Sequence, residues 1–313
     1  VQVPAGEYPS FEVRTNLRMG ANRPGYPELE RADRLEGITY HNHGRTGEVY
    51  QMEGPAWEND RVGFRNYLDQ RNGMDIFGKL TGRMVLDSVG IAGRQSYHER
   101  DSWGMDVLKV GTSLGAGSIA CHYRDSLFRV GDNGSGAYRA VVEGPLRSLL
   151  ELSFSGWNVS GQSVDVVHRV GIQAGTRYYN GRISLSGAGV EMDPVTGIVN
   201  MKSDSLHVME LNERVTGFLT HAPQSEDTTM LAMALLVHSA DVKEYGEAPG
   251  SGGGITETYY VVLDAGGDQD AEYRFYALWE QEDPRWSSLE EVTSFLRREA
   301  DRWEEPVRIE KQK

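Results

Sequence analysis

A histidine pair stands near the start of the chain, in the segment Tyr40-His41-Asn42-His43. On a β-strand, His41 and His43 project from one face and Asn42 from the other. Two imidazoles on one face suit proton transfer or substrate contact, and they could also hold a metal ion. A third metal ligand is not evident nearby, so we favour catalysis or substrate binding over a metal site or a purely structural pair. No cofactor is required by the sequence, and a divalent cation at His41 and His43 is left open.

A second polar cluster runs from Trp57 through Asp69, and Arg71, Asn72, Asp75 and Lys79 continue its polar content. From Arg61 onward polar and apolar residues alternate, which predicts a strand with Arg65 and Tyr67 on one face and Phe64 on the other. Arginine forks bind carboxylates through two parallel hydrogen bonds, and aromatic rings stack on the apolar faces of sugars. A merely solvated strand face is the alternative interpretation. The residues of this cluster that we expect to contact a substrate are Trp57, Arg61, Arg65 and Arg71.

The third cluster is Tyr97-His98-Glu99-Arg100-Asp101-Ser102-Trp103, in a predicted loop. Loops on rigid β scaffolds often carry function, and a Tyr-His pair beside Arg and Trp favours an acid-base site. We expect Tyr97, His98 and Arg100 to be catalytic, together with His43 from the first cluster. The further side chains expected to contact the substrate are Trp103 in this cluster, His122 and Tyr123 after it, and His41 in the first cluster.

These clusters, in this order, resemble a bacterial family from polysaccharide-utilisation loci, long filed as a domain of unknown function. The segments that carry the resemblance are Gly-Pro-Ala-Trp-Glu-Asn-Asp-Arg-Val-Gly-Phe-Arg at 54–65, Asp-Gln-Arg-Asn-Gly-Met-Asp-Ile-Phe-Gly-Lys at 69–79 and Tyr-His-Glu-Arg-Asp-Ser-Trp-Gly-Met-Asp-Val-Leu-Lys-Val-Gly at 97–111. Members are similar to the ulvan oligosaccharide dehydratases of marine bacteria. The resemblance implies a hydro-lyase that removes water from the non-reducing-end uronic acid of an oligosaccharide and leaves a 4,5-unsaturated residue.

That chemistry sets requirements that the residues can be compared with. The proton alpha to a carboxylate is very weakly acidic, so a site must neutralise the carboxylate, supply a base and protonate the departing hydroxyl. We hypothesise that His43 and either Tyr97 or His98 transfer protons, and that Arg61 or Arg100 neutralises the carboxylate. In a glucuronate the proton and the leaving oxygen share one ring face, so one Tyr or a close Tyr/His pair suffices. In an iduronate they lie on opposite faces, and two separated residues are needed.

Three other functions stay open at this stage. A polysaccharide lyase abstracts the same proton but expels a glycosidic oxygen, and the two activities need nearly identical residues. A non-catalytic carbohydrate-binding protein would also use aromatic and arginine clusters, although several His and Tyr residues grouped with carboxylates favour an enzyme. A glycoside hydrolase needs a pair of carboxylates, and no spacing in the sequence marks one pair out.

Composition limits the partners. Lys plus Arg number 32 and Asp plus Glu 46 among 313 residues, and the resulting net charge of −14 disfavours a nucleic-acid binder but not an acidic oligosaccharide held in a local arginine cleft. The sequence has no run of 18 apolar residues, so we expect no membrane-spanning helix. No obligate protein partner is evident. The single cysteine, Cys121, is expected to be buried and inert. We expect a periplasmic or secreted bacterial protein whose signal peptide is not part of this chain.

The elements that must position these residues are mostly strands. Period-two alternation recurs along the chain, and Gly-rich turns such as Gly131-Asp132-Asn133-Gly134 separate the strands. This predicts an all-β fold, a large antiparallel β-sandwich of the supersandwich or mutarotase-like kind, as one domain over 1–313 with an N-terminal segment at 1–35. Ser287 followed by Glu290 predicts a docking helix over 287–304. Expected strands include Arg83–Ser88, Val107–Val110, Leu127–Val130, Ala137–Glu143, Arg182–Ser186, Val215–Thr220 and Thr258–Leu263, and His168 is expected in the core.

Overall fold

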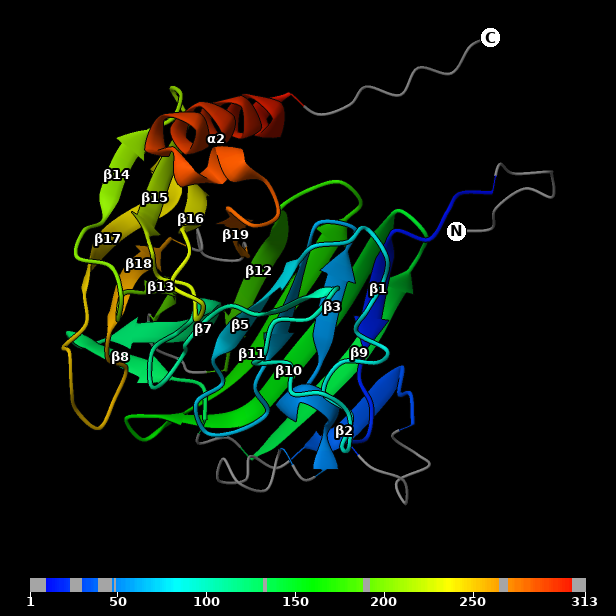
Figure 1. Cartoon of the computed structure of the whole chain (residues 1–313). Helices are drawn as coiled ribbons and strands as arrows, with labels where there is room; N and C mark the ends of the chain where they lie inside the picture. Colours follow the sequence, from blue (N-terminus) through cyan, green and yellow to red (C-terminus); the bar gives the residue numbers. More distant parts are fainter. Residues whose placement is uncertain are drawn as a thin grey trace, which may run out of the picture.

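A computed structural model describes residues 10–22, 30–38, 47, 49–131, 134–187, 192–264 and 270–305. Within these ranges the architecture is three antiparallel sheets and one long C-terminal helix (Figure 1). A nine-stranded sheet has the order β14-β15-β16-β19-β12-β11-β10-β9-β2. Two five-stranded sheets have the orders β1-β3-β4-β5-β6 and β17-β18-β13-β7-β8. The expected all-β antiparallel sandwich is therefore confirmed.

The strand bounds show how the chain is divided among the sheets. In the first five-stranded sheet they are β1 (Thr15–Arg18), β3 (Ala56–Asn59), β4 (Val62–Asn66), β5 (Met74–Lys79) and β6 (Gly104–Asp106). In the nine-stranded sheet they are β2 (Arg34–Ile38), β9 (Ser135–Glu143), β10 (Arg147–Val159), β11 (Gln162–Gln173), β12 (Tyr178–Ser186), β14 (His207–Glu210), β15 (Val215–Ala222), β16 (Leu231–His238) and β19 (Ala271–Trp279). The remaining sheet holds β7 (Ala116–Tyr123), β8 (Ser126–Arg129), β13 (Asp193–Val199), β17 (Val242–Glu247) and β18 (Thr258–Leu263).

Aromatic side chains fill the space between the first five-stranded sheet and the nine-stranded sheet. Trp57 and Phe64, paired across β3 and β4, meet Tyr179 of β12 at ring-centroid distances of 5.5 and 4.9 Å. Phe275 of β19 lies 6.2 Å from Phe64. Alternation puts these rings on the inward face of their strands, where their large apolar surface contributes most to burial.

The third sheet approaches the same core so closely that it requires glycine. At Gly117, whose φ is +85°, an added Cβ would lie 2.4 Å from the Tyr179 hydroxyl. That hydroxyl donates to the carbonyl of Ala116 at 2.7 Å. Glycine allows both the left-handed backbone and the close approach.

A helix covers one end of the nine-stranded sheet. Helix α2 (Leu289–Glu304) lies across β15 and β16 in Figure 1, and its buried Val292 and Leu296 pack into one apolar cluster with Leu236 and Tyr276. Its N-cap is Ser288, whose hydroxyl accepts from the Glu291 N–H. The predicted cap at Ser287 is thus wrong by one residue, because the 3-10 turn Pro284–Ser287 precedes the helix. No described helix is long and apolar enough to cross a membrane.

Two expected strands are absent at their predicted positions. Residues 83–88 form turns instead, because the Glu58 carboxylate accepts from the N–H groups of Val85 and Leu86 and draws that segment inward. At 107–110 the chain has already left β6, since the Asp106 carboxylate accepts from Leu108 N–H and bends the backbone. The other five strands are present at or near the positions predicted for them. They are β8, β9, β12, β15 and β18.

Two buried polar residues behave as the sequence predicted. Cys121 is buried on β7, and burial raises the pKa of its thiol to about 12. His168 is buried on β11, where its Nε2 meets the Tyr273 hydroxyl at 2.9 Å, and burial lowers its pKa to about 3. Both side chains are therefore uncharged core residues at neutral pH.

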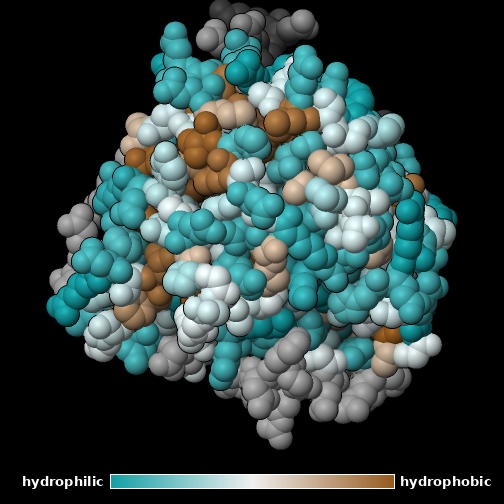
Figure 2. All heavy atoms as spheres, turned by 60° about the vertical axis from the view of Figure 1, so that its left-hand side comes forward, coloured by the Kyte–Doolittle hydropathy of each residue, from teal (hydrophilic) through white to brown (hydrophobic). Residues whose placement is uncertain are grey.

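The surface is mainly hydrophilic, as the composition requires. Figure 2 shows the face that carries β14, β17 and α2, where apolar atoms form separate patches among polar ones. Exposed large apolar residues on these elements are Val208 of β14, Tyr245 of β17 and Leu289 of α2. Apolar side chains scattered in this way are ordinary on a folded protein and do not by themselves indicate a docking surface.

One ion pair buried in the first five-stranded sheet should make a large contribution to stability. Lys79 Nζ donates to Glu58 at 2.5 Å and to the Asn59 carbonyl at 2.7 Å, and both charged side chains are almost fully buried. We expect Lys79→Met to lower the free energy of unfolding by about 3–5 kcal/mol, because it leaves the Glu58 charge buried without its partner. Urea denaturation measures this.

Two further variants make that measurement specific. The exposed Lys109 supplies the control, and Lys109→Met should change the free energy of unfolding by less than about 0.5 kcal/mol. Adding Glu58→Gln to Lys79→Met removes the orphaned charge and should restore part of the loss. Equal stabilities for the wild type and Lys79→Met would contradict a structural role for the pair.

Candidate functional site

The candidate site is built around Arg65, on the face of the first five-stranded sheet that points away from the aromatic core. Phe64 points into that core, so its neighbour Arg65 points outward. Strand pairing sets Arg65 opposite Asp75 on β5 and sets Asp106 of β6 opposite Phe77. Because side chains two apart share a face, Asp75 and Phe77 both project beside Arg65. Three strands thus bring one cation and two carboxylates together.

Arg65 has no exposed surface, and all its donors are engaged. Nη2 donates to Asp75 at 2.6 Å and to Asp106 at 2.9 Å, and Nε donates to Asp75 at 3.2 Å. Nη2 also lies 2.7 Å from the Tyr67 hydroxyl, which in turn donates to Asp75 at 2.6 Å. A guanidinium enclosed in this way fixes the positions of its partners rather than moving toward a ligand.

A strained turn closes one side of the cluster. Met52 and Glu53 both have left-handed φ angles, of 54° and 64°, although neither is glycine. This turn brings the Met52 carbonyl to 3.2 Å from Arg65 Nη1 and a Glu53 carboxylate oxygen to 3.7 Å from it. Gly47 lies beside Glu53 as well. Two consecutive strained residues at an ion-pair cluster are typical of functional sites.

The segment between β5 and β6 covers the cluster and supplies Tyr97 and His98. Arg65 Nη1 donates to the Tyr97 hydroxyl at 2.9 Å, and the Tyr97 ring packs edge-on to Phe77. Trp103 contacts Phe77 as well, so Phe77 forms the floor under the covering segment. The His98 ring centroid lies 4.3 Å from that of Tyr97. A tyrosine and a histidine are therefore adjacent above one buried cation.

His98 connects the buried cluster to the surface. Its Nδ1 lies 3.3 Å from Asp106, while 61% of its side chain is exposed. The hydrogen bond to Asp106 raises the pKa of His98. Burial, together with the nearby charge of Asp75, raises the pKa of Asp106 to about 7. Two proton-binding groups joined by one hydrogen bond titrate as a pair, and here they do so near neutral pH, which is the range a general acid or base requires.

Tyr97 keeps its proton at neutral pH. Burial raises the pKa of its phenol, although the Arg65 charge and hydrogen bond act in the opposite direction. An uncharged phenol that accepts from an arginine can donate its proton to a developing oxyanion, and the arginine then stabilises the phenolate. Tyr97 is thus suited to be an acid and His98 to be a base.

Arg71 extends the positive charge toward solvent. Its guanidinium lies 4.1 Å from the centroid of the Tyr67 ring and forms a bidentate ion pair with Asp69, with the shortest distance 2.6 Å. One fifth of the Arg71 side chain is exposed. Arg65 lies 4.5 Å from the same ring, so Tyr67 links the two arginines.

The structure brings together Arg65, Arg71, Tyr97, His98 and Trp103 from the residues that the sequence indicated. The stacking role expected for Trp57 is wrong, because its ring is fully buried in the core against Phe64 and Tyr179. Sequence alternation could not decide this, since both faces of β3 are buried.

Arg61 and Arg100 do not join the cluster, which corrects their expected place in the site. Arg61 lies in the β3–β4 turn, with Asp60 at 3.7 Å and Glu282 at 3.4 Å. Arg100 donates to Gln281 at 2.8 Å. Both side chains are directed to the turn after β19, where they are exposed.

His122 and Tyr123 are also placed elsewhere, contrary to the sequence expectation. Their strand begins beside the site, since Gly115 bridges to Met74, but they occupy its far end, about 20 Å away along the chain at 3.3 Å per residue. There His122 lies opposite Asp193 in the pairing of β7 with β13, and the guanidinium of Arg124 lies over the ring of the buried Tyr123. His41 and His43 lie outside the described residues.

Sequence reasoning left four members of the cluster out of the predicted site. They are Glu53, Tyr67, Asp75 and Asp106. Tyr67 and Asp75 lie within the polar segment that was singled out, and Asp106 follows Trp103 by three residues. One signal was available in the sequence, because the period of two places Arg65 and Tyr67 on the same strand face. If an arginine on that face is buried, it requires carboxylates on the neighbouring strands. Within the described ranges, no three of His, Cys, Asp and Glu are grouped as metal ligands.

Comparison with known proteins assigns the chain to a protein family. Residues 1–309 match the family model described as "Domain of unknown function (DUF4861)". The chain belongs to this family. Among curated proteins, no match was found.

The His98–Asp106 pair can be measured directly. We expect the pKa of His98, followed by NMR of its imidazole, to lie above 6.5 in the wild type and to fall toward 6.5 in Asp106→Asn. The asparagine still accepts a hydrogen bond but removes the negative charge that favours the imidazolium. His207 of β14 serves as the internal reference. A His98 titration unaffected by Asp106→Asn would show that the two side chains are not coupled.

Proposed function

We propose that this DUF4861 member is a carbohydrate-active dehydratase. It removes water from the non-reducing-end uronic acid of ulvan-type oligosaccharides and leaves a 4,5-unsaturated uronyl residue. The observation that supports the proposal is the adjacency of Tyr97 and His98 above the Arg65 cluster, with Asp106 behind His98. An acid and a base of suitable pKa next to cationic side chains are what alpha-proton abstraction from a uronate needs.

His98 acts as the base in this proposal. Asp106 holds Nδ1, so Nε2 is the ring nitrogen available to take the proton from C5 of the uronate. The Asp106 carboxylate then stabilises the imidazolium that forms, as a carboxylate does behind a catalytic histidine. The electron pair left on C5 forms the C4–C5 double bond.

Tyr97 acts as the acid. As the C4–O4 bond breaks, the Tyr97 phenol donates its proton to the departing hydroxyl, which leaves as water. The phenolate is stabilised by Arg65 Nη1 and then regains a proton from the imidazolium or from solvent. The sum is one uronate converted into one unsaturated uronate and one water, with the enzyme unchanged.

The substrate carboxylate must be neutralised for C5 to become acidic enough. Arg71 provides this charge in our proposal, since its guanidinium lies beside Tyr67 and its side chain reaches solvent. Arg65 is enclosed and acts as a positioning residue for Tyr97 and Asp106. Because Tyr97 and His98 are neighbours, the proposal favours a terminal glucuronate, whose C5 proton and O4 share a ring face, over an iduronate.

The proposal includes the cellular location of the protein. An enzyme that acts on oligosaccharides from an external polysaccharide belongs in the periplasm or outside the cell, and its partner is the acidic oligosaccharide itself. A polysaccharide lyase would use the same residues and is separated from a dehydratase by its products. A lyase shortens the chain, whereas a dehydratase keeps every sugar residue and removes one water.

The direct test is incubation with an ulvan oligosaccharide that ends in a saturated glucuronate, with and without a chelator, followed by mass spectrometry and ultraviolet absorbance. We expect a product lighter by one water. Tyr97→Phe and His98→Ala should each lower kcat by about 10²–10⁴-fold, because each removes a proton-transfer group.

Matched substitutions control for indirect effects on the fold. His207→Ala and Tyr245→Phe remove the same chemical groups from surface strands and should keep wild-type turnover. Thermal unfolding of each variant shows that the fold is retained. Wild-type turnover in both Tyr97→Phe and His98→Ala, or a shortened oligosaccharide as product, would overturn the proposal.

The pH profile tests the role of the His98–Asp106 pair. The base must be free of its proton, so kcat should rise as pH increases across the neutral range, in which the His98–Asp106 pair gives up a proton. Asp106→Asn lowers the pKa of His98, so it should move this rise to lower pH while also reducing the maximum. A profile whose acid limb stays in place in Asp106→Asn would exclude His98 as the base.

A further inference from the structure

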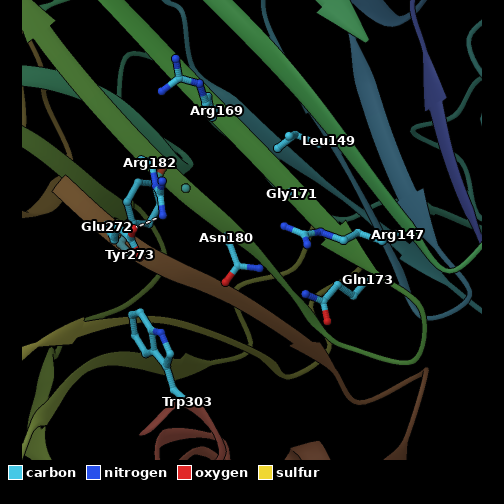
Figure 3. Close-up of a pocket in the computed structure, with 11 residues that line it drawn as sticks. Arg147, Leu149, Arg169, Gly171, Gln173, Asn180, Arg182, Glu272, Tyr273 and Trp303 are labelled. Carbon is cyan, nitrogen blue, oxygen red and sulfur yellow. Dashed lines mark hydrogen bonds and ion pairs between the residues drawn. The ribbon is translucent and has the colours of Figure 1, made fainter. Parts of the chain in front are cut away.

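The outward face of the nine-stranded sheet carries a hollow of about 290 Å³, shown in Figure 3. We call it the outer hollow and define it by Arg147, Leu149, Gly171, Asn180, Arg182 and Trp303. Leu150, Val170 and Tyr179, the sequence neighbours of its lining residues, point into the core. The outer hollow therefore lies across the nine-stranded sheet from the Arg65 site and is separate from it.

A missing side chain creates the outer hollow. Strand pairing places Gly171 of β11 between Leu149 of β10 and Asn180 of β12. A Cβ added at Gly171 would come no nearer than 3.7 Å to Leu149, and the backbone there is not left-handed. The position thus has room for a Cβ, and the glycine leaves the sheet surface open at this point.

Positive charge is concentrated around the outer hollow, although the whole chain carries −14. Three arginines line it, Arg147, Arg169 and Arg182, together with one carboxylate, Glu272, which pairs with Arg182. The nearby carboxylates are shared between arginines, since Glu151 pairs with both Arg139 and Arg169. Asp270 in turn lies 3.4 Å from Arg169 and 3.8 Å from Arg182. The carboxylates Glu151, Asp270 and Glu272 balance Arg139, Arg169 and Arg182, so Arg147 supplies the excess positive charge of the outer hollow. Such a local charge attracts anions against the overall sign of the protein.

Two groups in the outer hollow keep donors available. Arg147 is exposed and forms no hydrogen bond or ion pair with the part of the chain that the structure describes. The Asn180 side-chain oxygen accepts from Arg274 at 3.0 Å, which fixes the amide and directs its NH₂ group to the side where Arg147 and Gln173 lie (Figure 3). An arginine fork and an oriented amide are the donors that a carboxylate or sulfate with neighbouring hydroxyls requires.

Part of the lining of the outer hollow is apolar. Leu149 lies in the floor next to Gly171, and Trp303 of α2 stands at the rim with Arg274 4.3 Å from its ring. Sugars present C–H faces to such surfaces and hydroxyls to amides. The volume is near the lower end of the range for small-molecule sites, enough for about one sugar ring.

We propose that the outer hollow is a second, non-catalytic binding site for one acidic residue of a saccharide. Its carboxylate or sulfate ester sits on Arg147, its hydroxyls face Asn180, and its C–H face lies on Leu149 and Gly171. On a long chain, a site distant from the reacting end keeps the polymer attached between turnovers and raises its effective concentration.

The test is binding to the intact protein, measured by calorimetry and by amide NMR shifts of Gly171 and Asn180. Three disaccharide probes separate the chemistries, namely one with a glucuronate, one with a sulfate ester and the neutral parent. We expect the acidic probes to bind and the neutral one to bind at least about tenfold more weakly. Arg147→Gln and Gly171→Val should each weaken the acidic probe by about tenfold or more, because one removes the charge-assisted bonds and the other fills the floor.

Controls separate this inference from the proposed function. Arg83→Gln removes an exposed arginine elsewhere and should bind as the wild type does. Tyr97→Phe should keep binding at the outer hollow even where dehydration is lost. Unchanged affinity in both Arg147→Gln and Gly171→Val overturns the inference and leaves the dehydratase proposal standing. Stronger displacement by a glutamate hexapeptide than by the acidic disaccharides would also overturn it, in favour of a peptide ligand.

Discussion

The burial of Arg65 is the constraint on which the candidate site depends. A guanidinium without exposed surface is stable only when carboxylates and hydroxyls satisfy its donors. Here those partners come from Tyr67 just after β4, from β5 and β6, from the strained turn at Met52 and Glu53, and from the covering segment. Satisfying one cation therefore fixes Tyr97 and Asp106, and Asp106 in turn orients His98. Loss of any one partner would leave a buried charge without a hydrogen-bond partner, which is costly. The side chains are therefore held in these positions.

The two faces of the first five-stranded sheet have different roles. Trp57 and Phe64 project inward to the aromatic core, while Arg65 and Asp75 project outward to the site. The buried Glu58–Lys79 pair holds the start of the covering segment through Val85 and Leu86, so the segment that supplies Tyr97 and His98 is anchored by a second internal charge. Stability and site geometry are coupled through these two charge systems.

Charge is used differently on the opposite side of the molecule. The Arg65 cluster is enclosed and holds more carboxylate than guanidinium, which raises the pKa of Asp106 and keeps a proton within the site. The outer hollow is open and has an excess of arginine, with Arg147 facing solvent. A proton-transfer centre and an anion-binding surface are thus compatible with one acidic protein, because the nine-stranded sheet keeps them apart.

Much of the secondary structure follows from local pattern. Alternation gave the all-β fold, most strands and the polar face shared by Arg65 and Tyr67, because a strand's period of two is visible in the sequence. The adjacent Tyr97 and His98 were also evident as a pair. Capping chemistry located the helix to within one residue.

Only the tertiary structure decided which of these residues meet. Both faces of β3 and β4 are buried, so alternation could not show that Trp57 faces the core and Arg65 the site. Arg61 and Arg100 were separated from the cluster by ion pairs and hydrogen bonds with a turn about 180 to 220 residues away, and Asp106 was joined to His98 by the pairing of β5 with β6. Such contacts depend on strand register over long distances, which local sequence pattern does not encode.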